Sequence, residues 1–290
     1  MEMNHRQIKR VVTHSTVFHA DDVFGVAMWK LINPKIEVIR TLKPEDYVGD
    51  DTIIFDIGLG KYDHHQEDKA MRPAEPGKDP VPYCGFGLLW RDYGYLLCPE
   101  KEAWKRVDNT LVLSIDKADN GIQQNMLSTS IKAMNPNWNA VETEDDAFLR
   151  AMHVAMTILK AHVDQANSAV AAKDLIMASF EYKEVLVLDK YLPWTDTVLG
   201  DERLKDILFV VYPSLRGGWN VQTVPKAQGC FSNRMDFPKE WLGHADPERG
   251  IHFAHTSNFL IACDTKDQAI KVAEEAVQEG LESSQLVYSV

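Results

Sequence analysis

The chain has 290 residues, a formal net charge of −12 at pH 7 and 45% hydrophobic residues. This length suits two domains of ordinary size or one large one, and the apolar content is sufficient for a substantial core. The acidic charge argues against a broad basic surface that grips nucleic acid nonspecifically, although a carboxylate-rich pocket filled with divalent cations would still attract a phosphate substrate.

The N-terminal part alternates strand and helix patterns. The predicted elements are strands at residues 9–15, 35–41 and 50–58, helices at 20–32, 85–97 and 103–121, and a Pro- and Gly-rich loop at 71–82. The third strand is apolar almost throughout, which suits a strand buried on both faces. This order predicts an α/β fold with a mainly parallel sheet and flanking helices.

Residues 143–180 are predicted to form one long helix, because apolar residues recur at helical spacing after a capping-box-like start at Thr143 and Asp146. The remaining third changes to strand patterns. Strands are predicted at residues 184–189, 206–213, 219–225 and 259–264, followed by a capping box at Thr265 and Gln268 and a final helix at 266–280. This part therefore favours a smaller α+β unit.

Composition also bears on the compartment. No stretch reaches about 18 uninterrupted apolar residues, so no membrane span is expected. The N-terminus has neither the apolar segment nor the cleavage site of a secretory signal. The four cysteines lie far apart without a CxxC pair, which argues against a disulfide framework or a cysteine zinc site. We expect a cytoplasmic protein with reduced thiols.

Potential metal ligands gather where the predicted elements end. The candidates are His14, His19, Asp21, Asp22, Asp56, Asp63, His64, His65, Asp116 and Asp119. In an open α/β sheet, ligand sites lie beyond the carboxyl ends of the strands, so separate loops would bring these groups together.

An ordinary structural role is open for most candidates. Asp21 and Asp22 could simply cap a helix, and Asp119 could belong to a turn that ends one. Asp56 lies within a run of Ile and Phe, and a carboxylate buried there must be paired or bound to a cation. The candidates form four clusters, at residues 14–22, 56, 63–65 and 116–119, and each cluster lies at the end of a predicted element. A shared metal site is therefore a better interpretation than four unrelated structural roles.

The ligand types indicate which metal to expect. Histidine and aspartate without cysteine suit manganese, and magnesium or zinc less decisively. Two divalent ions about 3.5–4 Å apart need a bridging carboxylate, and Asp56 is the candidate for that bridge. Such a site activates water for attack on a phosphorus atom.

These motifs resemble the DHH phosphoesterase superfamily, which includes manganese pyrophosphatases and RecJ-like exonucleases, and are most similar to the melanocyte-proliferating-gene protein family. The segments that carry the likeness are THSTVFHADD, IIFDIG, KYDHHQ, DKADNGI, RGGWNVQTVP and GIHFAHTSNF, which together span residues 13–259. The resemblance implies a DHH-like catalytic domain at 1–145, a helical linker at 146–182 and a smaller substrate-binding α+β domain at 183–290.

The resemblance also implies roles for individual residues. Asp56 matches the bridging aspartate and His64 a metal-binding histidine. His65 would bind metal or phosphate, Asp63 would orient a histidine, and one further aspartate would supply the last ligand. That last ligand is either Asp116 or Asp119.

The first motif departs from the superfamily's usual spacing, H-x-x-x-D-x-D. The resemblance therefore does not decide whether His14, His19 or both touch the metal. It also does not choose between Asp21 and Asp22, which should point in different directions.

A metal pair also needs a surface that holds the rest of the substrate. Candidate substrate-binding residues in the C-terminal part are Arg216, Gly217, Gly218, Arg234, His252 and His255. An arginine can bind phosphate in a bidentate manner, and the two glycines permit close backbone approach. A plain hairpin turn is the alternative for the Arg-Gly-Gly segment.

The leading hypothesis is a metal-dependent phosphoesterase with two divalent ions, manganese being preferred over magnesium or zinc. The resemblance implies 3′–5′ exonuclease or phosphodiesterase activity on RNA or short oligonucleotide ends. The alternatives are a metal-dependent hydrolase of a non-phosphate bond and a noncatalytic metal-binding module, because a fold does not fix a function. The sequence leaves the oligomeric state open, a dimer included, and predicts no membrane partner.

Overall fold

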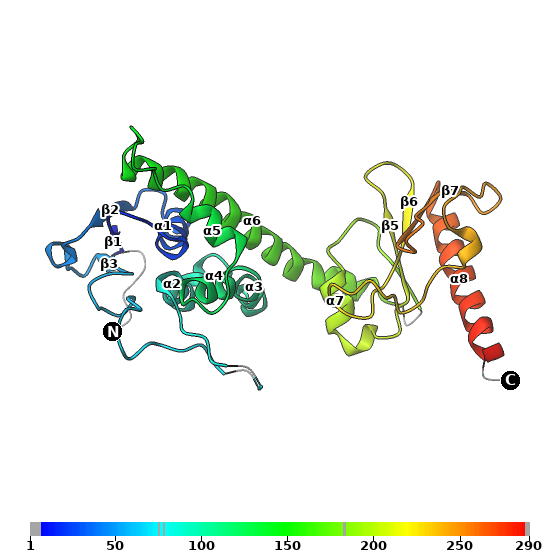
Figure 1. The fold of residues 1–290 in the computed structure, drawn as a ribbon. Helices are drawn as coiled ribbons and strands as arrows, with labels where there is room; N and C mark the ends of the chain where they lie inside the picture. Colours follow the sequence, from blue (N-terminus) through cyan, green and yellow to red (C-terminus); the bar gives the residue numbers. More distant parts are fainter. Residues whose placement is uncertain (1–6, 75, 78, 182–183, 288–290) are drawn as a thin grey trace. The chain divides into compact units, whose positions relative to one another are not determined.

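The computed structural model describes residues 7–74, 76–77, 79–181 and 184–287. The chain divides into two compact units, Met1–Asn167 and Ser168–Val290 (Figure 1). The longest helix, α6 (Glu144–Ala178), begins in the first unit and ends in the second, so the division falls within it. Across the described residues, no helix combines the length and the apolarity needed to cross a membrane.

The first unit contains a three-stranded parallel sheet in the order β2-β1-β3. Its strands are β1 (Arg10–His14), β2 (Glu37–Thr41) and β3 (Thr52–Ile54). The central strand is rich in β-branched residues and mostly buried, as expected for a strand with neighbours on both sides. The predicted parallel sheet is confirmed, and the carboxyl ends of β1 and β3 lie at one edge.

The third strand is shorter than the predicted 50–58. It ends at Ile54 because Asp56 has a φ of 58°, a left-handed conformation that a strand cannot continue. Phe55 still pairs with Tyr62 in an isolated bridge. The chain therefore turns away from the sheet where the predicted ligand Asp56 stands.

Helices of the first unit pack beside this sheet. They are α1 (Ala20–Ile32), α2 (Gly85–Tyr93), α3 (Lys101–Val107), α4 (Leu113–Asp119) and α5 (Met126–Lys132), with 3-10 turns η2 (Pro44–Tyr47) and η3 (Gly94–Leu96). Helix α1 contacts β1, α2, α4 and α5, which explains why nearly all of its residues are buried. The predicted helix at 103–121 is interrupted by the π-helical turn η4 (Asp108–Val112), and α5 was not predicted.

The second unit has a five-stranded sheet in the order β4-β5-β6-β8-β7, in which only β4 and β5 pair in parallel. The strands are β4 (Val185–Val187), β5 (Phe209–Pro213), β6 (Trp219–Thr223), β7 (Ile251–Ala254) and β8 (Leu260–Cys263). Shorter helical elements are α7 (Thr195–Gly200), η5 (Glu202–Leu204) and η6 (Lys239–Trp241).

One long helix, α8 (Lys266–Val287), packs on this second sheet. The predicted capping box at its start is confirmed. The backbone N–H of Gln268 donates to Thr265 Oγ1 at 3.3 Å, and the Thr265 N–H donates to Gln268 Oε1 at 3.0 Å. Between α8 and the sheet lies a core that includes Phe209, Val221 and Ile261.

Close packing of α1 against Phe55 and α2 gives the first prediction. A Cβ at Gly25 would overlap the ring of Phe55 and lie 3.2 Å from Leu89 Cδ1. We expect Gly25→Ala to lower the free energy of unfolding by about 1–3 kcal/mol, because an overpacked core must shift. Denaturant unfolding measures this. Gly200→Ala is the control, because nothing lies within 4 Å of its Cβ position; equal effects of the two substitutions would contradict the packing.

Candidate metal centre

Asp56 stands between two histidines. Its Oδ2 lies 3.3 Å from His14 Nε2 and its Oδ1 lies 2.9 Å from His64 Nε2. The backbone N–H of Asp56 donates to Tyr62 O at 3.1 Å, and a Cβ at Gly85 would come within 3.0 Å of Asp56 Cβ. These contacts hold the left-handed backbone and direct the two carboxylate oxygens to opposite partners.

The first group of ligand atoms joins the end of β1 to the start of α1. His14, Asp22 and Asp56 each offer one atom, and these atoms all lie within 4.8 Å of one another. The contact from His14 Nε2 to Asp22 Oδ2 measures 3.1 Å. The other oxygen of Asp22 accepts the N–H of His19 at 3.0 Å, so the same side chain also caps α1.

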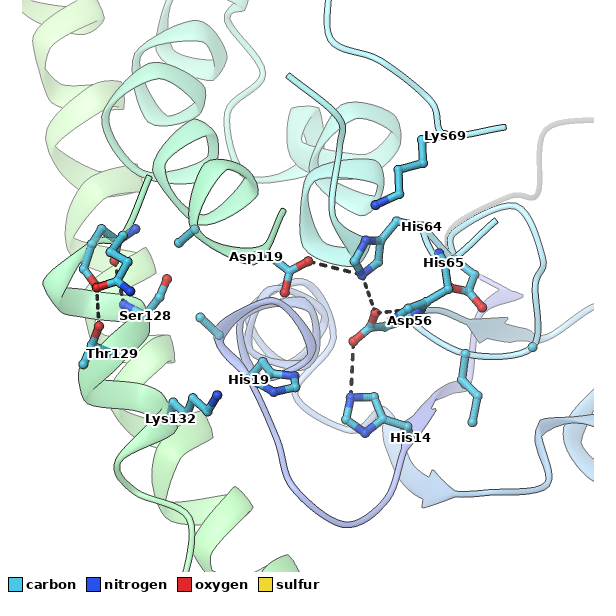
Figure 2. A pocket seen from close by; sticks show the side chains of 17 residues that line it. His14, His19, Asp56, His64, His65, Lys69, Asp119, Ser128, Thr129 and Lys132 are labelled. Atoms are coloured by element: carbon cyan, nitrogen blue, oxygen red, sulfur yellow. Dashed lines mark hydrogen bonds and ion pairs between the residues drawn. The ribbon is translucent and has the colours of Figure 1, made fainter. Parts of the chain in front are cut away.

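The second group joins α1 to the end of α4. It consists of Asp21, His64 and Asp119, again with ligand atoms within 4.8 Å of one another. His64 Nε2 lies 3.5 Å from Asp21 Oδ2 and 3.3 Å from Asp119 Oδ2 (Figure 2 shows the second contact). The consecutive residues Asp21 and Asp22 therefore face different groups, as expected from helical geometry.

His65 and Asp63 form a third contact at the pocket. The ring Nδ1 of His65 lies 2.7 Å from Asp63 Oδ1, which also accepts the His65 backbone N–H at 3.0 Å. The other oxygen of Asp63 accepts the Leu59 N–H at 2.7 Å. His65 forms a ligand group with Asp56 and His64 but is exposed. Asp63 thus fixes the orientation of a histidine at the mouth of the site.

The pKa values follow from burial and these pairings. Burial alone would lower the pKa of His14, but its contacts with Asp22 and Asp56 raise it to about 10. Burial would raise the pKa of Asp56, but the hydrogen bonds with His14 and His64 hold it at about 2. Burial and the neighbouring carboxylates of Asp56 and Asp119 raise the pKa of Asp21 well above its usual range. The carboxylates therefore repel one another, and the imidazoles offset this repulsion at Asp56 but not at Asp21.

Among the described residues, both oxygens of Asp21 lack hydrogen-bond partners. Oδ2 of Asp22, Oδ1 of Asp56 and Oδ2 of Asp119 are also buried, and their close side-chain contacts are with imidazoles. Asp21 and Asp22 are fully buried, and an unpartnered buried carboxylate is strongly unfavourable. Divalent cations would satisfy these atoms, and the set of imidazole and carboxylate donors suits Mn²⁺, Zn²⁺ or Mg²⁺. The residues present thus fit a metal centre.

Two predicted ligands lie outside these groups. His19 lines the pocket, but neither the first nor the second group includes its ring. Asp116 is fully buried and pairs with Arg72, whose Nε donates to Asp116 Oδ2 at 2.5 Å. Arg72 also donates to Asp108 at 2.6 and 3.0 Å, and the Cys84 N–H donates to Asp116 Oδ1 at 2.9 Å. Of the two alternatives for the last ligand, the geometry favours Asp119.

A cavity of about 940 Å³ opens beside the two groups. One side holds His14, Asp56 and His64, and another is formed by α5 (Figure 2). Sequence reasoning missed Lys69, Gln124, Asn125, Ser128, Thr129 and Lys132, which also line it. The sequence signal that could have revealed α5 is Asn125, a residue type that favours the start of a helix. In the structure Asn125 is the N-cap of α5 and accepts the Ser128 N–H at 2.6 Å.

The Arg216-Gly217-Gly218 segment of the second unit forms the turn between β5 and β6. Arg216, Gly217 and His252 line a cavity of about 540 Å³. Gly218 has a φ of 70°, and the carbonyl oxygen of Cys263 occupies the place of a Cβ. The segment is therefore a tight turn, as the alternative interpretation held, and it also faces a cavity. His255 shares a separate cavity of about 390 Å³ with His252.

Arg234 has a different environment from the one predicted. Its Nη1 donates to the backbone carbonyls of Leu204 and Ile207 at 2.8 and 2.9 Å, and its Nη2 donates to that of Val198 at 3.2 Å. These bonds tie together three segments of the second unit. The geometry gives Arg234 a structural role and leaves the substrate-binding expectation without support.

Imidazoles and carboxylates that converge at the carboxyl edge of a parallel sheet, beside a large cavity, are typical of metal-dependent hydrolases. Residues 10–277 match the family MYG1_exonuc, whose description is "Uncharacterised protein family (UPF0160)". The chain belongs to this family.

Named relatives support the same class. A MYG1 exonuclease of Bos taurus is 26% identical over 323 residues, which cover 93% of this chain and 85% of the relative. A MYG1 protein of Saccharomyces cerevisiae is 26% identical over 335 residues, which cover 94% and 97%. The crystal structure of RecJ with Mn²⁺ from Thermus thermophilus is similar over 94% of this chain and 53% of that one, at 14% identity and a TM-score of 0.28.

Matched substitutions separate the roles of Asp119 and Asp116. We expect Asp119→Asn to weaken Mn²⁺ binding at least about tenfold, with little loss of stability, because a ligand is lost. Asp116→Asn should instead lower the free energy of unfolding by about 1–3 kcal/mol and leave Mn²⁺ affinity near that of the wild type, because it weakens the buried pairing with Arg72. Calorimetric titration and urea unfolding measure both, and the reverse pattern would contradict this assignment.

Metal uptake should depend on pH. The raised pKa of His14, about 10, means that the metal-free side chain is protonated at pH 7 and must release its proton to coordinate a cation. The apparent Mn²⁺ affinity should therefore rise by about tenfold per pH unit for each proton released. Calorimetry in buffers of different ionisation enthalpy counts these protons. His14→Gln should release fewer, and a wild-type titration without proton release would contradict the geometry.

Proposed function

We propose that this protein is a metal-dependent nuclease that cleaves phosphodiester bonds, acting as a 3′–5′ exonuclease on RNA or short oligonucleotides. The observation that carries the proposal is the position of Asp56, whose two oxygens face the imidazoles of two separate ligand groups. That arrangement is what a carboxylate needs to bridge two cations. The exonuclease names of the mammalian relatives support the nuclease class.

The proposed ligands divide between the two groups. His14, Asp22 and Asp56 would hold one divalent ion, and Asp21, His64 and Asp119 the other, with Asp56 shared. Manganese is the proposed metal, because mixed imidazole and carboxylate donors without thiolates suit it. When bound, the two ions would neutralise the carboxylates, activate water and stabilise the charge that develops on the phosphate.

The remaining residues act on the substrate. His65 is exposed at the pocket and held by Asp63, so it can contact a phosphate oxygen or donate a proton to the leaving oxygen. The burial of Asp21 and Asp22 excludes water from the inner side of the site. In the second unit, Arg216, Gly217 and His252 line a cavity of their own and are proposed to bind substrate there.

The test is cleavage of labelled oligoribonucleotides with Mn²⁺. We expect Asp56→Asn to lower the rate by at least about 10²-fold, because one pre-organised electrostatic group is lost. Asp46→Asn makes the same chemical change at an exposed position of η2 and should leave the rate unchanged. A 5′ label should give a ladder of shortened products if cleavage runs 3′–5′. Equal rates in wild type and Asp56→Asn, or no cleavage with Mn²⁺, Mg²⁺ or Zn²⁺, would overturn the proposal.

A further inference from the structure

The wall of the metal pocket opposite the ligand groups is a polar face of α5. Asn125, Ser128, Thr129 and Lys132 all line the pocket, and their spacing of three or four residues places them on one side of a helix. Ile131 is buried away from it. This wall presents an amine, two hydroxyls and an amide, and none of the imidazole or carboxylate donors that form the ligand groups. Its chemistry therefore suits a substrate rather than a metal.

Two lysines reach the pocket from different sides. In Figure 2, Lys132 extends from α5 toward His19, whereas Lys69 points toward His64. The amine of Lys69 donates to Asn120 Oδ1 at 3.0 Å. Within the described parts of the chain, the amine of Lys132 has no hydrogen-bond or ion-pair partner. A cation that points into an acidic pocket without a partner is suited to an incoming anion.

The charges of the pocket indicate what that anion is. Two divalent cations would neutralise the carboxylates of Asp21, Asp22, Asp56 and Asp119. The two lysine amines would then add two positive charges, one on each side of the metal pair. A single phosphodiester has one negative charge, so it would balance only one of the two. A substrate with a second phosphate next to the reacting one would use this charge.

We infer that Lys132 binds the phosphate adjacent to the scissile one, so that the pocket takes an oligonucleotide end with two consecutive phosphates. The inference rests on the proposed function for the placement of the scissile phosphate at the ligand groups. Ser128 lies one turn before Lys132 on the same face and lines the same pocket. Lys132 is a substrate-positioning residue.

The test compares binding of two probes to the Mn²⁺-loaded protein. Both are fluorescent ribodinucleotides with a phosphorothioate linkage, which resists cleavage, and only one carries a 5′-phosphate. We expect Lys132→Met to weaken binding of the phosphorylated probe about tenfold and to leave the unphosphorylated probe unchanged. The slope of log affinity against log salt for the phosphorylated probe should fall by about one.

Lys105→Met is the matched control, because Lys105 is exposed on α3 and does not line the pocket. It should bind both probes as the wild type does, and Mn²⁺ affinity should be equal in all three proteins. The inference is overturned if Lys132→Met changes neither probe, if it weakens both equally, or if the wild type binds no dinucleotide. Lys132-dependent binding without turnover of any diester would support this subsite and contradict only the proposed nuclease activity.

Discussion

The first unit is organised around the repulsion between four carboxylates. Asp21, Asp22, Asp56 and Asp119 lie buried or largely buried, and their ion-pair contacts among the described residues are with the imidazoles of His14, His64 and, at 3.8 Å, His65. Like charges at such distances in a poorly solvated site raise one another's pKa values and destabilise the fold unless cations are present. A protein that binds cations here would be stabilised by them, since the cations bind the folded chain and have no comparable site in the unfolded one.

The four carboxylates and the histidines come together because each stands at or near the end of a strand or helix. Strand β1 delivers His14, the turn after β3 delivers Asp56, and the first turn of α1 delivers both of its aspartates, where the helix dipole favours negative charge. Asp56 adopts a left-handed backbone that costs about 1–3 kcal/mol in a residue other than glycine. The bond to Tyr62 and the absence of a side chain at Gly85 allow it. Strain at this position is thus linked to the direction of the carboxylate.

Much of this unit could be predicted because its signals are local. Runs of β-branched residues predict the parallel strands, and a carboxylate at the end of such a run predicts Asp56 as a buried polar group. The sorting of Asp21 and Asp22 into different groups follows from helical rotation only once the positions of His14 and His64 are known. His19 could not be separated from His14 by sequence, because both precede the aspartates of α1. In the structure the His19 ring lies outside the first and second ligand groups.

Other parts depend on contacts between residues far apart in the chain. The local sequence does not show whether Asp116 or Asp119 is the metal ligand. Arg72, which lies 44 residues before Asp116, pairs with Asp116 and so leaves Asp119 as the better candidate. Arg234 was predicted to bind phosphate because it is an arginine in a loop. In the structure its guanidinium donates hydrogen bonds to three backbone carbonyls instead. Helix α5 is too short for a clear periodic pattern.

The central claim is that two cations occupy the two ligand groups with Asp56 between them. Anomalous diffraction from Mn²⁺-soaked crystals, measured at the manganese absorption edge, tests it most directly. We expect two peaks, one bounded by His14, Asp22 and Asp56 and the other by Asp21, His64 and Asp119. No peak at these side chains, or manganese bound only elsewhere on the chain, would contradict the account.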